Sequence, residues 1–290
     1  MNRIPDSELI INPDGSVYHL HLKPEHIADN IIVVGDPGRV KLISSFFDSI
    51  EYQISNREFV THTGTYKNTR FTVLATGIGT DNIDIVLNEL DAAVNIDLST
   101  KKVKNEKRSL NIVRIGTSGA LQSEIPVDSF LLSEKAMGFD GLLHFYSSAL
   151  DVNEEEISKA FCKHANWNDN LAKPYVVSAS KSLTKKLEQG TIKGITATAS
   201  GFYAPQGRVL RLPTEMPNYP EMLSSFSYEG LKVTNFEMET SALYGLSKAL
   251  GHKAVTLCAI IANRKTKQFS ENHDLPIHGL ITHVLNNLTI

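Results

Sequence analysis

The sequence predicts an α/β fold in which a central mixed, largely parallel, twisted sheet is flanked by helices. Short runs rich in β-branched residues alternate with stretches of helical periodicity, which is typical of strands covered by helices on both faces. Three of these runs are followed by glycine-containing turns. The 290 residues contain no internal repeat and no Pro/Ser-rich linker, so a single domain over residues 1–290 is expected.

The predicted strands are short apolar runs, mostly bounded by Gly, Asn or Ser. They span residues 31–35, 71–77, 111–116, 129–135, 175–180, 194–200 and 254–263. Helical periodicity is present at residues 39–47 and 83–94. It is clearest at residues 238–250, where apolar side chains follow the i, i+3, i+4 pattern and Gly251 can end the helix.

Two segments depart from this alternation. Residues 1–15 form an N-terminal extension to which the sequence assigns no function. Residues 95–110 form a polar insertion with five basic residues and almost no apolar periodicity. The insertion is interpreted either as an anion-binding arm or as a solvated excursion between a helix and a strand. The solvated excursion is favoured, because Asp97 and Glu106 dilute the positive charge and the segment has no aromatic residue.

Composition excludes several classes of protein. With 29 Lys and Arg against 32 Asp and Glu, the net charge of −3 argues against nucleic acid or an anionic membrane as the main partner. The longest apolar run, residues 254–262, is far shorter than the ~20 residues that cross a bilayer, and the N-terminus lacks a signal-peptide stretch. Cys162 and Cys258 form no CxxC pair, so neither a disulfide framework nor a thiolate metal site is indicated. A cytoplasmic location is therefore expected.

The glycine turns are the first candidate site. They occupy residues 35–39 (GDPGR), 77–79 (GIG) and 116–119 (GTSG). Ligands of open α/β sheets bind beyond the carboxyl ends of the strands, so the three turns are expected to converge. Glycine lets backbone N–H groups approach an anion, and a helix that begins there adds its dipole. Arg39 and Arg114 add guanidinium groups, whose planar fork suits phosphate.

Other phosphate-binding and nucleophile motifs do not fit these turns. None of them reads as a Walker A loop, and G-x-G-x-x-G fails because Asn82 occupies its third glycine position. Ser118 is no nucleophile elbow, because Gly119 comes one residue too early. A hydrolase that uses a serine nucleophile is accordingly disfavoured.

Three further polar clusters follow. Residues 201–208 (GFYAPQGR) place an amide beside a guanidinium and aromatic rings, a combination that suits the edge of a planar heterocycle or simply a polar loop. Residues 236–240 (FEMET) put carboxylates at the start of the amphipathic helix. There they either favour the helix dipole or accept hydrogen bonds from sugar hydroxyls. Residues 260–264 (IIANR) end an apolar strand with an arginine.

In order along the chain, these motifs resemble those of the nucleoside phosphorylase superfamily, and its uridine phosphorylase branch in particular. The resemblance spans residues 18–268 and rests on GDPGR, NREF at 56–59, ATGIG at 75–79, RIGTSG at 114–119, FYAPQGR, FEMET and ANR at 262–264. The purine branch and the related nucleosidases typically carry an Asp near the last of these strands. Here Asn263, Arg264 and Lys265 stand at that place.

The resemblance implies a role for each matching residue. His19 and Arg57 would come from a neighbouring subunit, so at least a homodimer with shared active sites is implied. Arg114, Arg264 and Glu239 are the implied catalytic residues. The phosphate would be bound by Gly35, Arg39, Arg57, Arg114 and Thr117; the ribose by His19, Glu237, Met238 and Glu239; and the base by Ser118, Gly119, Phe202, Gln206, Arg208 and Arg264.

The implied activity is that of a pentosyltransferase: reversible phosphorolysis of uridine to uracil and ribose 1-phosphate in pyrimidine salvage. A preference for thymidine, deoxyuridine or a purine nucleoside is the alternative, and a non-catalytic nucleoside-binding protein is a third. Phosphate is the co-substrate, and no cofactor or metal is expected. His273, His278 and His283 are five residues apart, unlike a helical ligand pair, and are interpreted as structural.

The motifs say less about the number of subunits and about which segment covers the active site. Residues 80–82 (TDN) follow the GIG turn where many bacterial uridine phosphorylases have Gly-Pro-Ser, which leaves a bound monovalent cation and a hexamer open. The insertion at 95–110 favours a dimer over a higher assembly. The polar stretch at 265–274 is expected to form a lid.

Overall fold

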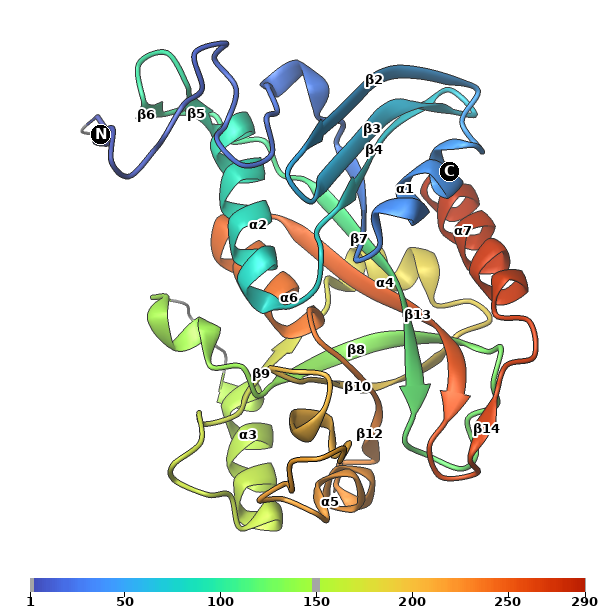
Figure 1. Cartoon of the computed structure of the whole chain (residues 1–290). Coiled ribbons are helices and arrows are strands. Elements are labelled where there is room, and N and C mark those ends of the chain that lie inside the picture. Colours follow the sequence, from blue (N-terminus) through green and yellow to red (C-terminus); the bar gives the residue numbers. More distant parts are fainter. Residues whose placement is uncertain (1–2, 148–151, 290) are drawn as a thin grey trace.

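One mixed sheet organises the computed structural model, which describes residues 3–147 and 152–289 (Figure 1). Among these residues the strand order is β11-β12-β10-β8-β13-β7-β1-β4-β3-β2, with β9 beside β8 and β14 beside β13. β5 and β6 form a separate hairpin. The strands are β1 (Asn30–Val34), β2 (Ser49–Asn56), β3 (Phe59–Tyr66), β4 (Thr69–Ala75), β5 (Ile96–Asp97), β6 (Lys102–Val103), β7 (Asn111–Ala120), β8 (Phe130–Gly138), β9 (Tyr175–Ser178), β10 (Ile192–Thr198), β11 (Ser227–Tyr228), β12 (Leu231–Glu237), β13 (Lys253–Asn263) and β14 (Gln268–Phe269).

The sheet is parallel in two blocks that antiparallel pairs join. Parallel pairing connects β12, β10 and β8 in one block and β13, β7, β1 and β4 in the other. Antiparallel contacts of β13 with β8 and of β12 with β7 link the blocks, so these strands curl into a closed ring. The carboxyl ends of strands from both blocks therefore face one another, which is where a site is expected in such a sheet.

Helices cover both faces of the sheet, as predicted. In Figure 1, α2 and α6 pack together on one side of β7 and β13, while α1 and α7 lie on the other side and α3 and α5 cover the lower end. The helices are α1 (Pro37–Ser44), α2 (Thr80–Asn95), α3 (Val152–Ala165), α4 (Lys181–Leu187), α5 (Tyr219–Ser225), α6 (Thr240–Leu250) and α7 (Asp274–Leu288), with 3₁₀ turns η1 (Pro24–His26), η2 (Leu142–Phe145) and η3 (Ala204–Gln206).

The amphipathic helix predicted at 238–250 is confirmed as α6. It ends at Gly251, whose φ of 81° is the left-handed conformation that glycine adopts readily. Its buried Tyr244 hydroxyl donates to the Ser133 carbonyl at 2.7 Å and accepts from the Thr256 amide at 2.8 Å. The helix is thereby fixed to β8 and β13, and its first turn is held over the carboxyl edge of the sheet.

The prediction that residues 116–119 form a turn is wrong, because β7 continues to Ala120. This extension is held by parallel pairing with β13 and by antiparallel pairing of Gly119 and Ala120 with β12. Gly116 serves packing instead of a turn. A Cβ added there would lie 2.3 Å from the guanidinium of Arg114 and 3.0 Å from the Cys258 sulfur.

The hairpin of β2 and β3 was not predicted, nor were β12 and the helices α3, α4, α5 and α7. β2 lies at the edge of the sheet and is largely exposed, and Thr and His interrupt the apolar alternation of β3. The two strands thus lack the apolar period that identifies a half-buried strand.

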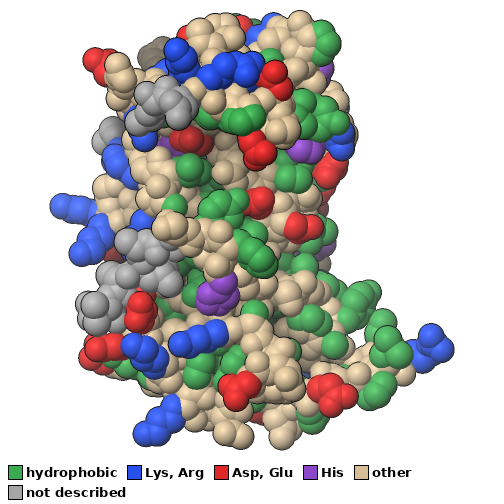
Figure 2. Space-filling model, turned by 90° about the vertical axis from the view of Figure 1, so that its left-hand side faces the viewer, with side chains coloured by type: hydrophobic (Ala, Val, Ile, Leu, Met, Phe, Trp, Pro, Cys, Tyr) green, Lys and Arg blue, Asp and Glu red, His purple; other side chains and the backbone are tan. Residues whose placement is uncertain are grey.

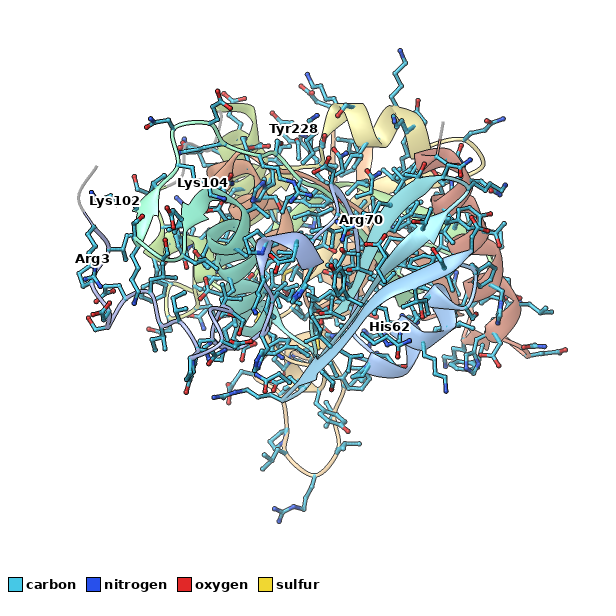
Figure 3. The ribbon with its side chains drawn as sticks, turned by 90° about the horizontal axis from the view of Figure 1, so that it is seen from above. Arg3, His62, Arg70, Lys102, Lys104 and Tyr228 are labelled. Carbon is cyan, nitrogen blue, oxygen red and sulfur yellow. The ribbon has the colours of Figure 1, made fainter. Side chains whose placement is uncertain are left out.

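The N-terminal extension and the polar insertion pack against each other (Figure 3). The Ile4 amide donates to the Lys101 carbonyl at 2.8 Å. The Lys101 ammonium reaches the Leu9 carbonyl at 2.7 Å and the Asp6 carboxylate at 2.6 Å, while Arg108 pairs with Asp29 at 2.5 Å. Basic residues of the insertion therefore bind the chain itself, which disfavours the anion-binding arm.

The charged side chains on the surface and the lengths of the helices agree with the near balance of charge and the short apolar runs in the sequence. Acidic and basic side chains are interspersed over the face shown in Figure 2. Among residues 3–147 and 152–289, none of the helices combines the length and the apolar character needed to cross a membrane.

Candidate active site

A cleft of about 630 Å³ opens where the two blocks of the sheet meet, a volume typical of small-molecule sites. Two predicted elements, the GDPGR turn and the start of α6, meet in it. The lining residues are Gly35, Asp36, Pro37, Arg39, Ile78, Arg114, Gly116, Thr117, Ser118, Gly119, Phe202, Gln206, Arg208, Phe236, Glu237, Met238, Glu239, Ile261, Ala262, Arg264 and Phe269.

One end of the cleft is built by the turn between β1 and α1. The Asp36 carboxylate caps the helix by accepting from the Gly38 amide at 2.9 Å, and Pro37 begins the helix. Arg39 follows in the first turn and donates to the Ile115 carbonyl at 3.4 Å. Burial, and secondarily the neighbouring Arg114, lowers the pKa of Arg39. Two guanidinium groups thus lie close together, an arrangement that attracts an anion.

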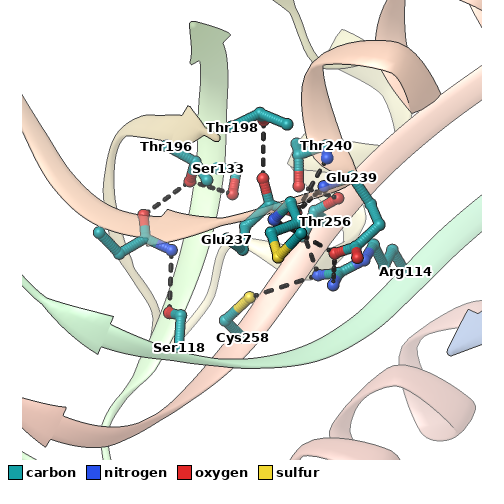
Figure 4. A network of polar contacts seen from close by, with 12 residues as sticks. Arg114, Ser118, Ser133, Thr196, Thr198, Glu237, Glu239, Thr240, Thr256 and Cys258 are labelled. Carbon is teal, nitrogen blue, oxygen red and sulfur yellow. Dashed lines mark hydrogen bonds and ion pairs between the residues drawn. The ribbon is translucent and has the colours of Figure 1, made fainter. Parts of the chain in front are cut away.

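Arg114 is buried between two carboxylates (Figure 4). Its Nη2 donates to Glu239, and its Nη1 lies 3.5 Å from Glu237 and 3.8 Å from the Cys258 sulfur. Burial alone would lower the pKa of Arg114, but Glu239 and Glu237 outweigh it and the pKa is raised. Its Nε is buried and has no hydrogen-bond partner among the residues that the structure describes.

Glu239 connects the second glycine turn to this end of the cleft. Its Oε1 accepts from the Gly79 amide at 2.9 Å, and its Oε2 accepts from Arg114 and from the Met238 amide at 3.3 Å. Gly79 adopts a φ of 99°, which only glycine tolerates well. The first two turns therefore converge on one site, as predicted.

The other end of the cleft carries the amide and guanidinium of the FYAPQGR segment. Arg208 donates to Gln206 Oε1 at 2.6 Å and to the Phe202 carbonyl at 2.7 Å, and its guanidinium lies 3.9 Å from the centre of the Phe202 ring. Burial, and secondarily the charge of Arg264, lowers the pKa of Arg208. Because a guanidinium only donates, the Gln206 amide oxygen must face Arg208. This pairing fixes the orientation of the amide.

Arg264 joins the same end from β13. It donates to the Gln206 carbonyl at 2.7 Å and lies 5.6 Å from the centre of the Phe236 ring. Gly119 lies beside it: a Cβ there would be 3.6 Å from Arg264 Cγ, an ordinary van der Waals contact. Three hydrogen-bonding side chains thus surround a space bordered by the rings of Phe202 and Phe236.

Ser118 is buried, and its hydroxyl accepts from the Asn235 amide at 2.9 Å. Asn235 in turn accepts from Thr196 at 2.7 Å. Ser118 is therefore part of a structural hydrogen-bond network, which agrees with the prediction that it is not a nucleophile.

His19 and Arg57 do not line the cleft of their own chain. They lie near each other instead: Arg57 donates to the Tyr18 hydroxyl at 3.2 Å, and Asn56 donates to the His19 carbonyl at 2.8 Å. The imidazole of His19 pairs with Glu89 at 2.6 Å. The structure thus groups both residues on one surface away from the residues that line the cleft.

The stretch predicted as a lid contains the turn that joins β13 to β14. Phe269 of β14 lines the cleft although 64% of it is exposed. The histidines nearby have structural contacts: His283 Nε2 lies 3.0 Å from the Leu187 carbonyl, and the His278 ring lies 5.9 Å from the Phe46 ring, tilted by 48°.

Several residues of the site were missed from the sequence. Thr198 and Asn235 hold Glu237 and Ser118, Cys258 lies under Arg114, and Phe269 borders the opening. Asn235 stands one residue before the FEMET motif, so a correct prediction of β12 would have drawn attention to it. Nothing in the local sequence marks Thr198 or Cys258.

Cys258 is expected to resist alkylation in the folded protein. It is fully buried, and burial raises the pKa of its thiol to about 11, so at pH 8 only about one thiol in a thousand is the reactive thiolate. Iodoacetamide at pH 8 should modify the partly exposed Cys162 first and reach Cys258 only after denaturation. Mass spectrometry of tryptic peptides measures both sites. Equal labelling of the two cysteines in native protein would contradict this burial.

The cleft holds two arginines and a carboxylate at the carboxyl edge of an α/β sheet, opposite an amide and further arginines. This arrangement is typical of enzymes that bind an anion beside a polar substrate that carries a ring. The chain belongs to the phosphorylase superfamily, whose family model matches residues 29–276.

The similarity to known proteins extends over most of the chain. It is 31% identical to the uridine phosphorylase of Thermococcus kodakarensis over 258 residues, which cover 89% of this chain and 81% of that protein. It is 29% identical to the uridine phosphorylase of Haemophilus influenzae over 264 residues, which cover 87% and 88%. A Trypanosoma brucei nucleoside phosphorylase described as showing uridine phosphorylase activity superimposes with a TM-score of 0.87 at 32% identity, covering 97% of this chain and 99% of that one.

Proposed function

We propose that this chain is a pentosyltransferase that catalyses the reversible phosphorolysis of uridine to uracil and ribose 1-phosphate. The observation that carries this proposal is the division of the cleft: Arg39 and Arg114 lie with Glu239 at one end, and Gln206 and Arg208 form a fixed pair at the other. The names of the relatives from T. kodakarensis and H. influenzae support the choice of uridine.

Phosphate is assigned to the end of the cleft with Arg39 and Arg114. Gly35 and Thr117 also line the cleft and are assigned to the phosphate. The guanidinium of Arg114 suits a phosphate oxygen, and its buried Nε has no partner within the described ranges. Arg57 of a second subunit would complete the set.

The sugar is assigned to the space between the two ends. Met238 lines it with an apolar surface, and Glu239 supplies carboxylate oxygens that accept from vicinal hydroxyls. His19 of the second subunit would reach the 5′-hydroxyl.

The base is assigned to the end with Gln206, Arg208 and Arg264. Uracil presents an N–H donor and two carbonyl acceptors on one edge, and an amide beside a guanidinium matches this pattern. Phe202 supplies an aromatic face, while Ser118 and Gly119 border the space opposite.

The proposed mechanism needs no nucleophile from the protein. Bound phosphate attacks C1′ while the glycosidic bond breaks through an oxocarbenium-like state, and the phosphate charge stabilises the developing positive sugar. The departing uracil gathers negative charge, which Arg208, Gln206 and Arg264 stabilise by donating hydrogen bonds. Preorganised donors of this kind contribute about 2.7–4 kcal/mol each to lowering a barrier. Phosphate is thus the co-substrate, and we assign the reaction no resident cofactor or metal.

We further propose a homodimer in the cytoplasm, with active sites shared between subunits. His19 and Arg57 lie together outside their own cleft, so the roles proposed for them require a second chain. Sedimentation should give the mass of two chains. A mass near that of six would contradict the dimer and leave the sharing of sites intact.

The first test is the conversion of uridine by purified protein with and without phosphate. Release of uracil only when phosphate is present is the expected result. Release without phosphate would make the protein a hydrolase and contradict the roles of Arg39 and Arg114. Release of a base from inosine or adenosine but not from uridine would contradict the assignment of the base site.

Gln206→Ala is expected to weaken base discrimination more than phosphate binding. The substitution removes a donor and an acceptor from the base end and leaves Arg208 without its 2.6 Å partner. The kcat/KM for uridine should fall by about ten- to a hundredfold, with the phosphate KM nearly unchanged. Kinetics with uridine, thymidine and inosine measure the ranking. Gln206→Glu is the matched variant, because it keeps an oxygen partner for Arg208 while it replaces the amide donor by a negatively charged acceptor. An unchanged substrate ranking in both variants would contradict the role.

A further inference from the structure

Glu237 lines the cleft and also accepts hydrogen bonds from the backbone of the residues that follow it. It ends β12, immediately before the residues that lead into α6, and its side chain is only 3% exposed. Its Oε1 accepts from the Thr198 hydroxyl at 2.7 Å. Its Oε2 accepts from the amides of Glu239 and Thr240, both at 2.9 Å (Figure 4).

These contacts direct both oxygens at the protein. Both oxygens of Glu237 accept from protein donors, as do both oxygens of Glu239, but the donors to Glu237 belong to the end of β10 and to the backbone at the start of α6. One of those donors is the backbone amide of Glu239, the residue assigned to the sugar. Glu237 therefore determines where the Glu239 backbone lies.

Glu237 also faces Arg114. Its Oε2 is 3.5 Å from Nη1 of Arg114, whose Nη2 donates to Glu239. Arg114 therefore lies between a carboxylate that is tied to the protein and one that is tied to Gly79 and Met238. Its positive charge is balanced twice, which moderates its attraction for phosphate.

Thr198 fastens this arrangement to a second element. Its hydroxyl donates to Glu237 and accepts from the Ser241 amide of α6 at 3.0 Å. The hydroxyl is fully buried, so it has no alternative partner in solvent. The end of β10, the end of β12 and the first turn of α6 are thus joined through one carboxylate.

We propose that Glu237 is a positioning residue of the phosphorolysis. It fixes the backbone of Glu239 and balances the charge of Arg114, and it touches neither phosphate nor nucleoside. This inference rests on the proposed function and replaces the ribose-binding role assigned to Glu237 from the sequence.

The test compares three variants in steady-state kinetics with both substrates varied. Glu237→Gln keeps the shape but removes the charge and turns one acceptor into a donor. Its kcat should fall about tenfold or more, because the amides of Glu239 and Thr240 or the Thr198 hydroxyl then face an NH₂ group. Its phosphate KM should fall about threefold, because Arg114 loses one of its two counter-charges.

The other two variants separate charge from geometry. Glu237→Asp keeps the charge but not the reach, so the phosphate KM should return towards the wild-type value while kcat stays low. Thr198→Val keeps the shape and the carboxylate charge, so it should lower kcat and leave the phosphate KM unchanged. A loss of thermal stability alone lowers kcat, but it cannot also lower the phosphate KM as expected for Glu237→Gln.

Two results would overturn the proposal. A Glu237→Gln variant that raises only the uridine KM would show that Glu237 binds the sugar directly. Equal losses in all three variants with no change in phosphate KM would show a purely structural role. If the wild-type protein releases no uracil, the proposed function fails, and calorimetric titration with inorganic phosphate decides the proposal separately. Tighter binding by Glu237→Gln than by wild type supports the charge balance, and equal binding contradicts it.

Discussion

Arg114→Ala is expected to reduce phosphorolysis by a factor of about 100 to 1,000 in kcat, even at saturating phosphate and uridine. The guanidinium lies between Glu237 and Glu239, and Arg114 lines the cleft. Its removal takes away the charge that holds the anionic nucleophile as the sugar becomes positive. It also leaves two buried carboxylates without their counter-charge, which costs about 3–5 kcal/mol of folding stability.

Activity and stability must therefore be measured together. Thermal unfolding of Arg114→Ala identifies the fraction that is folded at the assay temperature, and kcat is referred to that fraction. Arg114→Lys is the matched variant, because it retains a positive charge between the carboxylates but not the planar fork. It should unfold closer to wild type while kcat remains well below it. Near-normal turnover by folded Arg114→Ala at saturating phosphate would contradict the assigned phosphate site.

The parts of this site that were predictable are those formed by neighbouring residues. In GDPGR, Asp36 caps the helix that Pro37 begins, so the turn and the position of Arg39 follow from five residues. The helix α6 follows from its apolar period and from Gly251. These signals come from neighbouring residues, so the start and the end of each helix can be predicted from the sequence.

The parts that were not predictable depend on distant strands. Gly116 reads as part of a turn, but pairing with β13 and β12 keeps it in β7, where the absence of a Cβ makes room for Arg114. Whether a glycine serves a turn or close packing is decided by residues far away in the sequence. The edge hairpin that carries Arg57 was missed for a related reason, because its strands lack a continuous apolar face.

The roles of Glu237 and Glu239 also depend on residues that are distant in the sequence, although both glutamates belong to one motif. Both carboxylates stand in FEMET, and the sequence assigned both to the ribose. The two carboxylates differ in their hydrogen-bond donors. The Thr198 hydroxyl of β10 donates to Glu237, and the Gly79 amide donates to Glu239. Those partners come from segments about 40 and 160 residues away.

Glu239→Gln is expected to narrow the preference for uridine over 2′-deoxyuridine by about tenfold or more. Glutamine has the same shape, and its oxygen can still accept from the Gly79 amide, which lies 2.9 Å from Oε1 of Glu239. The NH₂ group that replaces the other oxygen cannot accept from a ribose hydroxyl and faces Arg114. A hydrogen bond to a charged acceptor is worth about 1.5–3 kcal/mol, and a 2′-deoxy substrate never makes the bond to the 2′-hydroxyl.

The measurement is kcat/KM for uridine and for 2′-deoxyuridine with wild type and variant. The second substrate serves as the internal control, because disturbance of Arg114 or of a 3′-hydroxyl contact lowers both rates, while loss of the 2′-hydroxyl contact lowers only the first. A fall for uridine that exceeds the fall for 2′-deoxyuridine would assign Glu239 to the sugar. Equal falls would mean that Glu239 does not bind the 2′-hydroxyl, which would then need another acceptor in the cleft.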